Sequence, residues 1–301
     1  MKEVARLETQ KSFAGNQEFG TLYLVPTPIG NLDDMTFRAI NILKEADLIA
    51  AEDTRNTAKL LNHFEISTHQ ESFHEHNSHS KIPELVDKLK SGMTIAQVSD
   101  AGMPSISDPG HDLVNACIEQ HISVVPLPGA NAGITALIAS GINPQPFMFY
   151  GFLPRKGKEQ KDALKDLAQK PETLILYEAP HRLKETLKVL ATAFSDQRQA
   201  VLCRELTKRH EEFIRGSFSE LLEWAQETEI RGEFVIIIDG NDHPTVGVID
   251  SESDALSGLS IKEQVDYFVE SGLKVNEAIK KVAKLHGIKK QLIYREYHQL
   301  D

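Results

Sequence analysis

Charged and polar residues gather directly after several apolar runs of this 301-residue chain, where they could bind a ligand. The longest such stretch, DAGMPSISDPG, begins at Asp100. Gly102 and Pro104 shape a turn in it, and Asp108 followed by Pro109 is typical of a helix start, with Asp108 as the cap. The unpaired N–H groups of that helix would point into the loop and suit an anion. The stretch predicts a ligand-binding loop, and an ordinary strand-to-helix connection is the alternative.

Three further stretches could do acid–base chemistry or hold phosphate groups. They are EDTR from Glu52, YEAPHR from Tyr177 and RELTK from Arg204. A positioned carboxylate can take up a proton, and Arg and Lys bind phosphate oxygens. Taken singly, each stretch could equally be a salt-bridged surface turn. The segment HEHNSH from His74 has three histidines, but without Cys or a helical H-x-x-x-H pair it indicates a solvated helix entry rather than a metal site.

The first half of the chain alternates between apolar runs and amphipathic patterns. This alternation predicts a doubly wound sheet with its site at the carboxyl ends of the strands. Neither G-x-G-x-x-G after the first strand nor a P-loop sequence occurs, so a dinucleotide or P-loop site has little support. We expect strands at 21–25, 47–51, 68–73, 93–98 and 122–127, and helices at 35–46, from after Arg55 to about 63, at 82–89, 111–119 and 134–140, the first of them capped by Asp33 or Asp34.

A second α/β unit follows the Pro-rich hinge at 143–146. Its polar stretches again fall mostly at strand ends, so we expect a small-molecule cleft between two α/β domains. The predicted domains are 20–142 and 143–240, after a flexible tail at 1–19. The second unit is expected to have strands at 147–152, 173–177, 200–204 and 234–239, and helices at 159–169, 183–194 and 218–226.

The C-terminal part differs in composition from the rest. Residues 241–259 are polar with Gly, Ser and Pro, which is typical of a linker. In the module 260–301, helices are expected at 261–271, 275–285 and 289–298, and the Gly-containing turn before the last of them gives a helix-turn-helix pattern. Nucleic-acid contact is one interpretation, and a helical cap or dimerisation element is the other. The phosphate-facing charges would be Lys289, Lys290 and Arg295.

Net charge and cysteine usage limit the function classes. The net charge of −11 argues against a generic nucleic-acid binder, although residues from Ser260 onward carry eight Lys/Arg against six Asp/Glu, or +2, and the preceding part carries −13. Cys117 and Cys203 have no C-x-x-C spacing, so we expect no metal and a reducing, cytoplasmic location. No segment is typical of a signal peptide or membrane span, which predicts a soluble protein without a membrane partner.

Eight ordered motifs between about Gly20 and Asp239 resemble one family. They are similar to those of the bacterial 16S rRNA cytidine-2′-O-methyltransferase branch of the tetrapyrrole methylase superfamily, and the last forty or so residues look like its helix-turn-helix extension. The resemblance implies two α/β domains with S-adenosylmethionine in the cleft between them, 16S rRNA within the small ribosomal subunit as the substrate, and a homodimer. The motifs are VPTPIGNLDDMTFRA, AAEDTRNT, SDAGMPSISDPG, PLPGANAGITAL, GFLPRKG, YEAPHR, CRELTK with HEEF, and RGEFVIII.

The resemblance also implies roles for individual residues. Glu178 or Asp53 would be the general base, and the cations would hold the RNA. The substrate would be bound by Arg55, His181, Arg182, Arg204 and Lys208. The methionine part of the cofactor would lie against Asp100, Gly102, Pro104, Ser105 and Ile106, and its adenosine against Ala130, Asn131, Ala132, Phe152, Leu153, Tyr177, Leu206, Glu233 and Phe234, with Pro28 closing one wall.

Two other functions fit parts of this pattern. One is a small-molecule methyltransferase that acts on a tetrapyrrole, and the other is a non-catalytic RNA-binding protein of ribosome assembly that keeps a methylase fold. Relatives that methylate tetrapyrroles have Gly-Asp-Pro where this chain has Gly102-Met103-Pro104. Met103 and the basic C-terminal helices therefore speak against a tetrapyrrole substrate.

Overall fold

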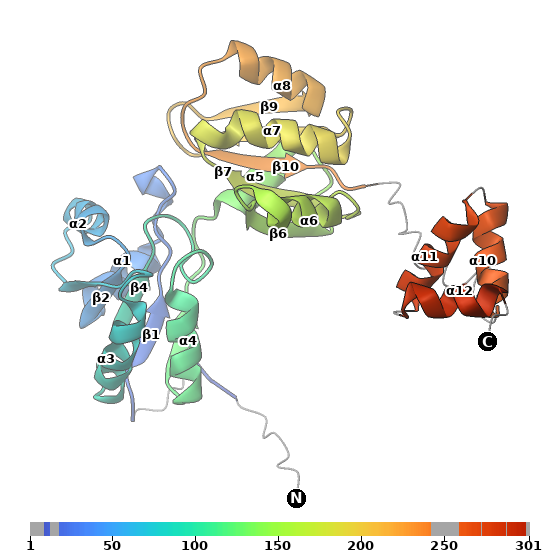
Figure 1. The fold of residues 1–301 in the computed structure, drawn as a ribbon. Coiled ribbons are helices and arrows are strands. Elements are labelled where there is room, and N and C mark those ends of the chain that lie inside the picture. Colours follow the sequence, from blue (N-terminus) through green and yellow to red (C-terminus); the bar gives the residue numbers. More distant parts are fainter. Residues whose placement is uncertain (1–8, 13–17, 242–258, 272, 287, 299–301) are drawn as a thin grey trace, which may run out of the picture. The chain divides into compact units, whose positions relative to one another are not determined.

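The computed structural model describes residues 9–12, 18–241, 259–271, 273–286 and 288–298. The chain divides into two compact units, Met1–Gly240 and Asn241–Asp301, which Figure 1 colours from blue to orange and in red. The predicted tail at 1–19 and the predicted linker at 241–259 lie largely outside the described residues. Among the residues that the structure describes, no helix is long and apolar enough to cross a bilayer.

The first sheet of the larger unit has five parallel strands in the order β3-β2-β4-β1-β5. Two helices cover each of its faces, so the prediction of a doubly wound sheet is confirmed. The strands are β1 (Thr21–Leu24), β2 (Leu48–Ala51), β3 (Gln70–Ser72), β4 (Ile95–Val98) and β5 (Ser123–Pro126), and α1 (Phe37–Glu45) and α2 (Thr54–His63) lie on the face opposite α3 (Ser78–Lys90) and α4 (Gly110–Glu119).

The central strands are apolar throughout because both of their faces are buried. In β2, Ile49 and Ala51 pack toward α1 and α2, whereas Leu48 and Ala50 pack toward α3 and α4. Successive side chains of a strand point to opposite faces, so a strand between two helix layers needs an unbroken apolar run. The apolar runs that predicted β2 and β4 result from this burial on both faces.

The second sheet is mixed, in the order β6-β7-β10-β8-β9, and only β6 and β7 are parallel. Three helices pack on one face and α5 packs on the other, as Figure 1 shows for α6, α7 and α8. The strands are β6 (Phe147–Phe152), β7 (Thr173–Glu178), β8 (Gln199–Arg204), β9 (Glu212–Ser217) and β10 (Phe234–Ile238), and the helices are α5 (Ala132–Ser140), α6 (Gly157–Leu167), α7 (Pro180–Phe194) and α8 (Phe218–Glu227).

Strand β9 and the packing of α5 differ from the expectations. The sequence analysis did not predict β9 because Glu212, Arg215 and Gly216 interrupt the apolar pattern of this edge strand. Helix α5 follows the first sheet in the chain, yet Ala136 and Leu137 are buried on β7, β8 and β10. Helix α5 was expected to belong to the first domain, which ends at residue 142, but it packs with the second sheet.

Two helix starts also differ from the expectations. The cap of α1 is Thr36, whose hydroxyl accepts from the Ala39 amide, and not Asp33 or Asp34, which belong to the 3-10 helix η1 (Leu32–Asp34). Helix α4 begins at Gly110 after Pro109, so Asp108 is not its cap residue. In both places the acidic residue lies two or more residues before the helix, close enough to mimic a cap in the sequence.

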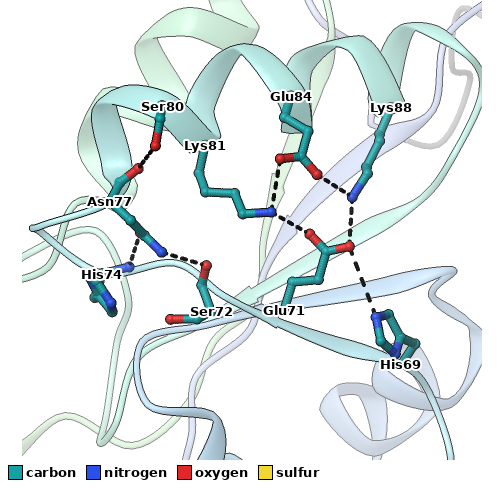
Figure 2. Close-up of polar contacts among 9 residues, drawn as sticks. All are labelled: His69, Glu71, Ser72, His74, Asn77, Ser80, Lys81, Glu84 and Lys88. Atoms are coloured by element: carbon teal, nitrogen blue, oxygen red, sulfur yellow. Dashed lines mark hydrogen bonds and ion pairs between the residues drawn. The ribbon is translucent and has the colours of Figure 1, made fainter.

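The histidine-rich segment is the entrance to α3, which begins four residues earlier than expected (Figure 2). Asn77 joins β3 to this helix, since its Oδ1 accepts from the His74 amide at 2.9 Å and its Nδ2 donates to the Ser72 carbonyl at 3.0 Å. The Glu71 carboxylate on β3 forms ion pairs with two lysines of α3, at 2.9 Å from Lys81 Nζ and 2.7 Å from Lys88 Nζ. These contacts cover the edge of the first sheet. Among the described residues, no group of His, Cys, Asp and Glu could hold a metal ion.

The far edge of the same sheet is contacted by the N-terminal segment. Gln10 donates to the Val124 carbonyl and accepts from the Val124 amide, both at 2.9 Å. The side-chain amide thus pairs with β5 as a neighbouring strand would. The described residues 9–12 of the expected flexible tail are therefore attached to the sheet.

The smaller unit is a three-helix module. Its core is formed by Val265, Phe268, Ile279, Val282 and Ile293, among other side chains. A capping box between Ser260 and Glu263 starts the first helix. The three predicted helices are confirmed within one residue, as α10 (Ile261–Glu270), α11 (Val275–Leu285) and α12 (Lys290–His298).

Candidate functional site

A cavity of about 460 Å³ lies where loops of the first sheet meet those of the second sheet. The loop after β4 forms one side, and the start of α5 with the ends of β6, β7 and β8 and the start of β10 forms the other. This volume lies within the range of small-molecule sites. The predicted site residues that line it are Asp100, Gly102, Ile106, Asn131, Ala132, Phe152, Tyr177, Glu178, Leu206, Lys208, Glu233 and Phe234.

The loop after β4 is held in shape by its own hydrogen bonds. Gly102 and Thr27 exchange two backbone bonds of 3.0 Å, which join this loop to the one after β1. Gly102 has φ +80°, a conformation that other residues adopt at a cost. The Asp108 carboxylate accepts from the amides of Ser105 at 2.7 Å and Gly110 at 2.8 Å. The first amide of α4 is therefore occupied by Asp108, which corrects the expectation of an anion pocket at that amide.

The start of α5 and an aromatic wall form the opposite side of the cavity. Asn131 caps α5 by accepting from the Ile134 amide at 2.9 Å, and the Tyr177 hydroxyl accepts from the Gly133 amide at 3.0 Å. Burial raises the pKa of the Tyr177 phenol. The exposed Phe152 ring lies edge-on to Tyr177, with 5.8 Å between the ring centres. Such a wall suits a planar ring system.

Two carboxyl groups give the cavity an acidic corner. Glu52, directly after β2, accepts from the Asp100 amide through Oε2 at 3.0 Å. Burial raises the pKa of Glu52, the hydrogen bond from the Asp100 amide opposes this rise in part, and the nearby carboxylates of Asp100 and Asp108 add to it. Glu52 belongs to the EDTR stretch, in which its neighbour Asp53 was the predicted base. This corner favours a cationic ligand.

The cation of the cavity wall is already paired. Among the described residues that line the cavity, Lys208 is the only Lys or Arg, and its Nζ lies 2.9 Å from both Glu205 Oε1 and Glu233 Oε2. Glu205 and Thr207 have positive φ angles of 50° and 66°, and a Cβ on Gly232 would lie 2.4 Å from the Glu205 Cγ. Strained backbone of this kind persists where the surrounding structure holds it.

Asp53 and Arg55 lie outside the cavity lining and are bound to each other. Asp53 caps α2 and accepts from the Arg55 amide at 2.9 Å, from Nε at 3.0 Å and from the guanidinium Nη2 at 2.6 Å. These bonds lower the pKa of Asp53 to about 2. A carboxylate with such a low pKa is a weak base at neutral pH.

Glu178 has its oxygens bonded within the protein. It is 3% exposed, and its Oε1 accepts from the Ala179 amide at 2.9 Å while Oε2 accepts from the Thr186 hydroxyl at 2.5 Å. Arg182 lies 3.4 Å from Glu178 and donates to the Leu153 carbonyl at 3.1 Å. This network anchors the start of α7 and directs both carboxylate oxygens of Glu178 toward donors within the protein.

The other predicted residues occupy varied surroundings. Arg204 donates to the Arg231 carbonyl at 2.7 Å and pairs with Glu212 at 3.2 Å. Pro28 lines a second, smaller cavity of about 230 Å³ together with Asp100, Asn56 and Lys59. Leu153 is a core residue of the second sheet, Pro104 is buried, and His181, Lys289, Lys290 and Arg295 are exposed. Ser105 and Ala130 adjoin the cavity in the chain but are not among its lining residues.

Several lining residues were not predicted. Ile29, Met103, Ser107, Cys203 and Val235 directly adjoin predicted positions in the sequence, as do Glu52, Ser99, Ala101, Ala179 and Pro180. Their signal was available, because every second residue of a strand end and each residue of an irregular loop can reach the same space. Asp108, two residues after Ile106, completes the lining.

Comparison with known proteins identifies relatives of this fold and sequence. The sequence model of the tetrapyrrole (corrin/porphyrin) methylases matches residues 21–222. The ribosomal RNA small subunit methyltransferase I of Streptococcus pyogenes serotype M3 is 54% identical over 294 residues, covering 98% of this chain and 100% of the relative. Its namesake from Bacillus subtilis is 52% identical over 292 residues, covering 97% and 99%. The uroporphyrin-III C-methyl transferase of Thermus thermophilus, complexed with S-adenyl homocysteine, superimposes with a TM-score of 0.53 at 17% identity, covering 73% of this chain and 97% of that one.

The network around Glu178 leads to a prediction about stability. We expect Glu178→Ala to lower the free energy of unfolding by about 1–3 kcal/mol, because the Thr186 hydroxyl and the Arg182 guanidinium lose a buried acceptor. Urea unfolding measures the change, followed by the fluorescence of Trp224. This single tryptophan lies on α8, which packs on the same sheet as α7. Glu185→Ala, at an exposed position of α7, is the control and should unfold like the wild type. Equal stability of both variants would contradict an anchoring role for Glu178.

Proposed function

The chain belongs to the tetrapyrrole (corrin/porphyrin) methylase family, and from this membership we propose that it transfers a methyl group from S-adenosylmethionine to a ribose 2′-hydroxyl. The acceptor is a cytidine of 16S rRNA in the small ribosomal subunit. The observation that carries the proposal is the cavity between the two sheets, which combines an acidic corner, an aromatic wall and loops preformed by backbone bonds. Relatives named for rRNA methylation match the chain over almost its whole length, including the helical module.

The residues of the cavity fit this cofactor. When bound, S-adenosylmethionine supplies a methyl group activated by a positively charged sulfonium. Asp100 and Glu52 provide negative charge for its cationic groups, and Phe152 and Tyr177 provide apolar faces for its adenine. The bonds that hold Gly102 and Asp108 keep the loop in one conformation before binding, which lowers the entropy cost of aligning donor and acceptor.

The RNA is held by surfaces other than the cavity. Lys208 is neutralised by two carboxylates, and the cavity wall has no unpaired Lys or Arg among its described residues. Arg55 has a side chain that is 87% exposed, and the smaller unit presents Lys289, Lys290 and Arg295 to solvent. RNA is recognised largely through its shape, its phosphates and its 2′-hydroxyl groups, so local cations suffice in an acidic chain.

The proposed assembly is a homodimer in the cytoplasm. Strand β6 is an edge of the second sheet, and Phe147 and Phe149 on it are partly exposed. Ile138 on the neighbouring helix α5 is 75% exposed. An apolar edge of this kind is protected when a second copy covers it. Analytical ultracentrifugation of the full chain tests this assembly, and the mass should be that of two copies.

Methylation of ribosomal RNA by the purified chain tests the proposed activity. We expect tritium from labelled S-adenosylmethionine to enter 16S rRNA taken from a strain that lacks the gene, and primer extension at low nucleotide concentration to stop at one cytidine. Labelling of free 16S rRNA and of small subunits shows which of them is the substrate. Transfer to a tetrapyrrole instead of RNA would support the small-molecule function, and RNA binding without any transfer would support the non-catalytic one.

Asp100 is predicted to contribute to cofactor binding. Asp100→Ala should weaken S-adenosylmethionine binding about 10- to 100-fold, because an interaction with a charged group contributes about 1.5–3 kcal/mol. Calorimetric titration of the full chain measures the affinity, and an unchanged melting temperature verifies that the fold is intact. Asp87→Ala, on the exposed side of α3, is the matched control and should bind like the wild type. Unchanged affinity in Asp100→Ala would place the cofactor elsewhere.

The helical module is predicted to act in RNA binding and not in cofactor binding. Removing the residues after Gly258 should weaken binding to the ribosomal substrate about tenfold or more, since its cations no longer contact phosphates. Cofactor affinity should stay unchanged, because the module has its own core and forms a separate compact unit. Filter binding and calorimetry measure the two affinities. An equal loss of cofactor binding would contradict this division.

A further inference from the structure

The carboxyl group of Glu52 is placed at the junction of two neighbouring strands. Strands β2 and β4 are paired with Ala51 opposite Val98, and the Glu52 amide donates to the Val98 carbonyl at 3.3 Å. This register brings Glu52 next to Asp100, whose amide donates to Oε2 at 3.0 Å. One oxygen of Glu52 is thereby held by the backbone. In the part of the chain that the structure describes, no other group binds Oε1, and Glu52 lines the cavity.

Methyl transfer to a hydroxyl group releases a proton that some group must accept. Among the carboxylates considered as the base, Asp53 is bound to Arg55 and lies outside the cavity lining, and Glu178 is bonded through both oxygens. Two carboxylates in the cavity wall are also occupied, since Asp108 accepts from backbone amides and Glu233 pairs with Lys208. Asp100 accepts from the Asn56 amide group at 3.4 Å and is proposed to bind the cofactor.

We propose that Glu52 is the general base that accepts the proton of the attacking 2′-hydroxyl, an inference that rests on the proposed function. As the bond between the ribose oxygen and the methyl carbon forms, the bond between that carbon and sulfur breaks, and its electron pair remains on sulfur. The O–H proton moves to Oε1 of Glu52. The products are the 2′-O-methyl ribose, the neutral thioether and a protonated carboxyl group, so charge and atoms balance.

The surroundings of Glu52 suit a proton acceptor. Burial raises its pKa, the hydrogen bond from the Asp100 amide opposes this rise in part, and the carboxylates that face it add to it, Asp100 and Asp108 from the loop after β4 and Asp53 beside it in the chain. Lys208 in the cavity wall is paired with two other carboxylates. A carboxylate with a raised pKa is a stronger base while it is ionised, so activity should increase as the pH rises through this pKa.

The substitution Glu52→Gln tests the proposal in the full chain. Glutamine keeps an oxygen that accepts from the Asp100 amide, so the loop is preserved while basicity is lost. We expect the single-turnover rate of methyl transfer at saturating S-adenosylmethionine to fall about 100- to 10,000-fold, which is more than the loss of cofactor affinity from the removed charge can explain. The wild-type rate should rise with pH to a plateau. The rising limb of this pH–rate profile should be absent from Glu52→Gln. Glu52→Asp, which retains a carboxylate, should recover part of the rate.

The outcomes separate this inference from the proposed function. Glu119→Gln carries the same chemical change at the exposed end of α4 and should match the wild type in rate and pH profile. If the wild type transfers no methyl group to 16S rRNA, the proposed function fails. If the wild type is active and Glu52→Gln retains its rate or its pH limb, Glu52 is not the base. A loss of cofactor affinity that accounts for the whole loss of rate would make Glu52 a cofactor-binding residue and overturn the proposal.

Discussion

The packing of helix α5 is the constraint on which the cavity depends. This helix leaves the first sheet at β5, yet it packs on the second sheet through Ala136 and Leu137. Small residues allow the close approach: a Cβ on Gly133 would lie 3.3 Å from Ile175. Arg215 on β9 completes the attachment by donating to the carbonyls of Ala139 and Ser140 at the helix end. The start of α5 therefore lies among strand ends of the second sheet while its preceding loop stays with the first.

The distribution of charge in the cavity separates cofactor binding from RNA binding. Glu52 and Asp100 leave negative charge facing the cavity, whereas Lys208 is neutralised by Glu205 and Glu233. A site with this balance attracts a sulfonium and repels phosphate. Under the proposed function, the RNA phosphates contact cations outside the cavity, which would account for an acidic body and a basic helical module in one chain.

Sequence periodicity predicted the elements of the fold because most of them are strongly apolar on the buried side. Strand β2 is buried on both faces and α11 has a clear apolar stripe, so their patterns are unambiguous. Strand β9 has one half-exposed face and contains Arg215, whose role is to bind the end of a helix distant in the chain. The packing of α5 could not be predicted either, because local periodicity shows that a helix has an apolar face but not which sheet that face contacts.

The candidate site was predicted at the level of segments more accurately than at the level of single side chains. Glu52 and Asp53 are neighbours in one polar stretch, and residue type alone cannot separate them. Their surroundings do, because Asp53 caps a helix and binds Arg55, which lowers the pKa of its carboxyl group, whereas Glu52 is half-buried in an acidic corner of the cavity, which raises its own pKa. Adjacent residues at a strand end point to opposite sides, and here one side is the helix start and the other is the cavity. The same peptide thus supplies a structural carboxylate and the proposed base.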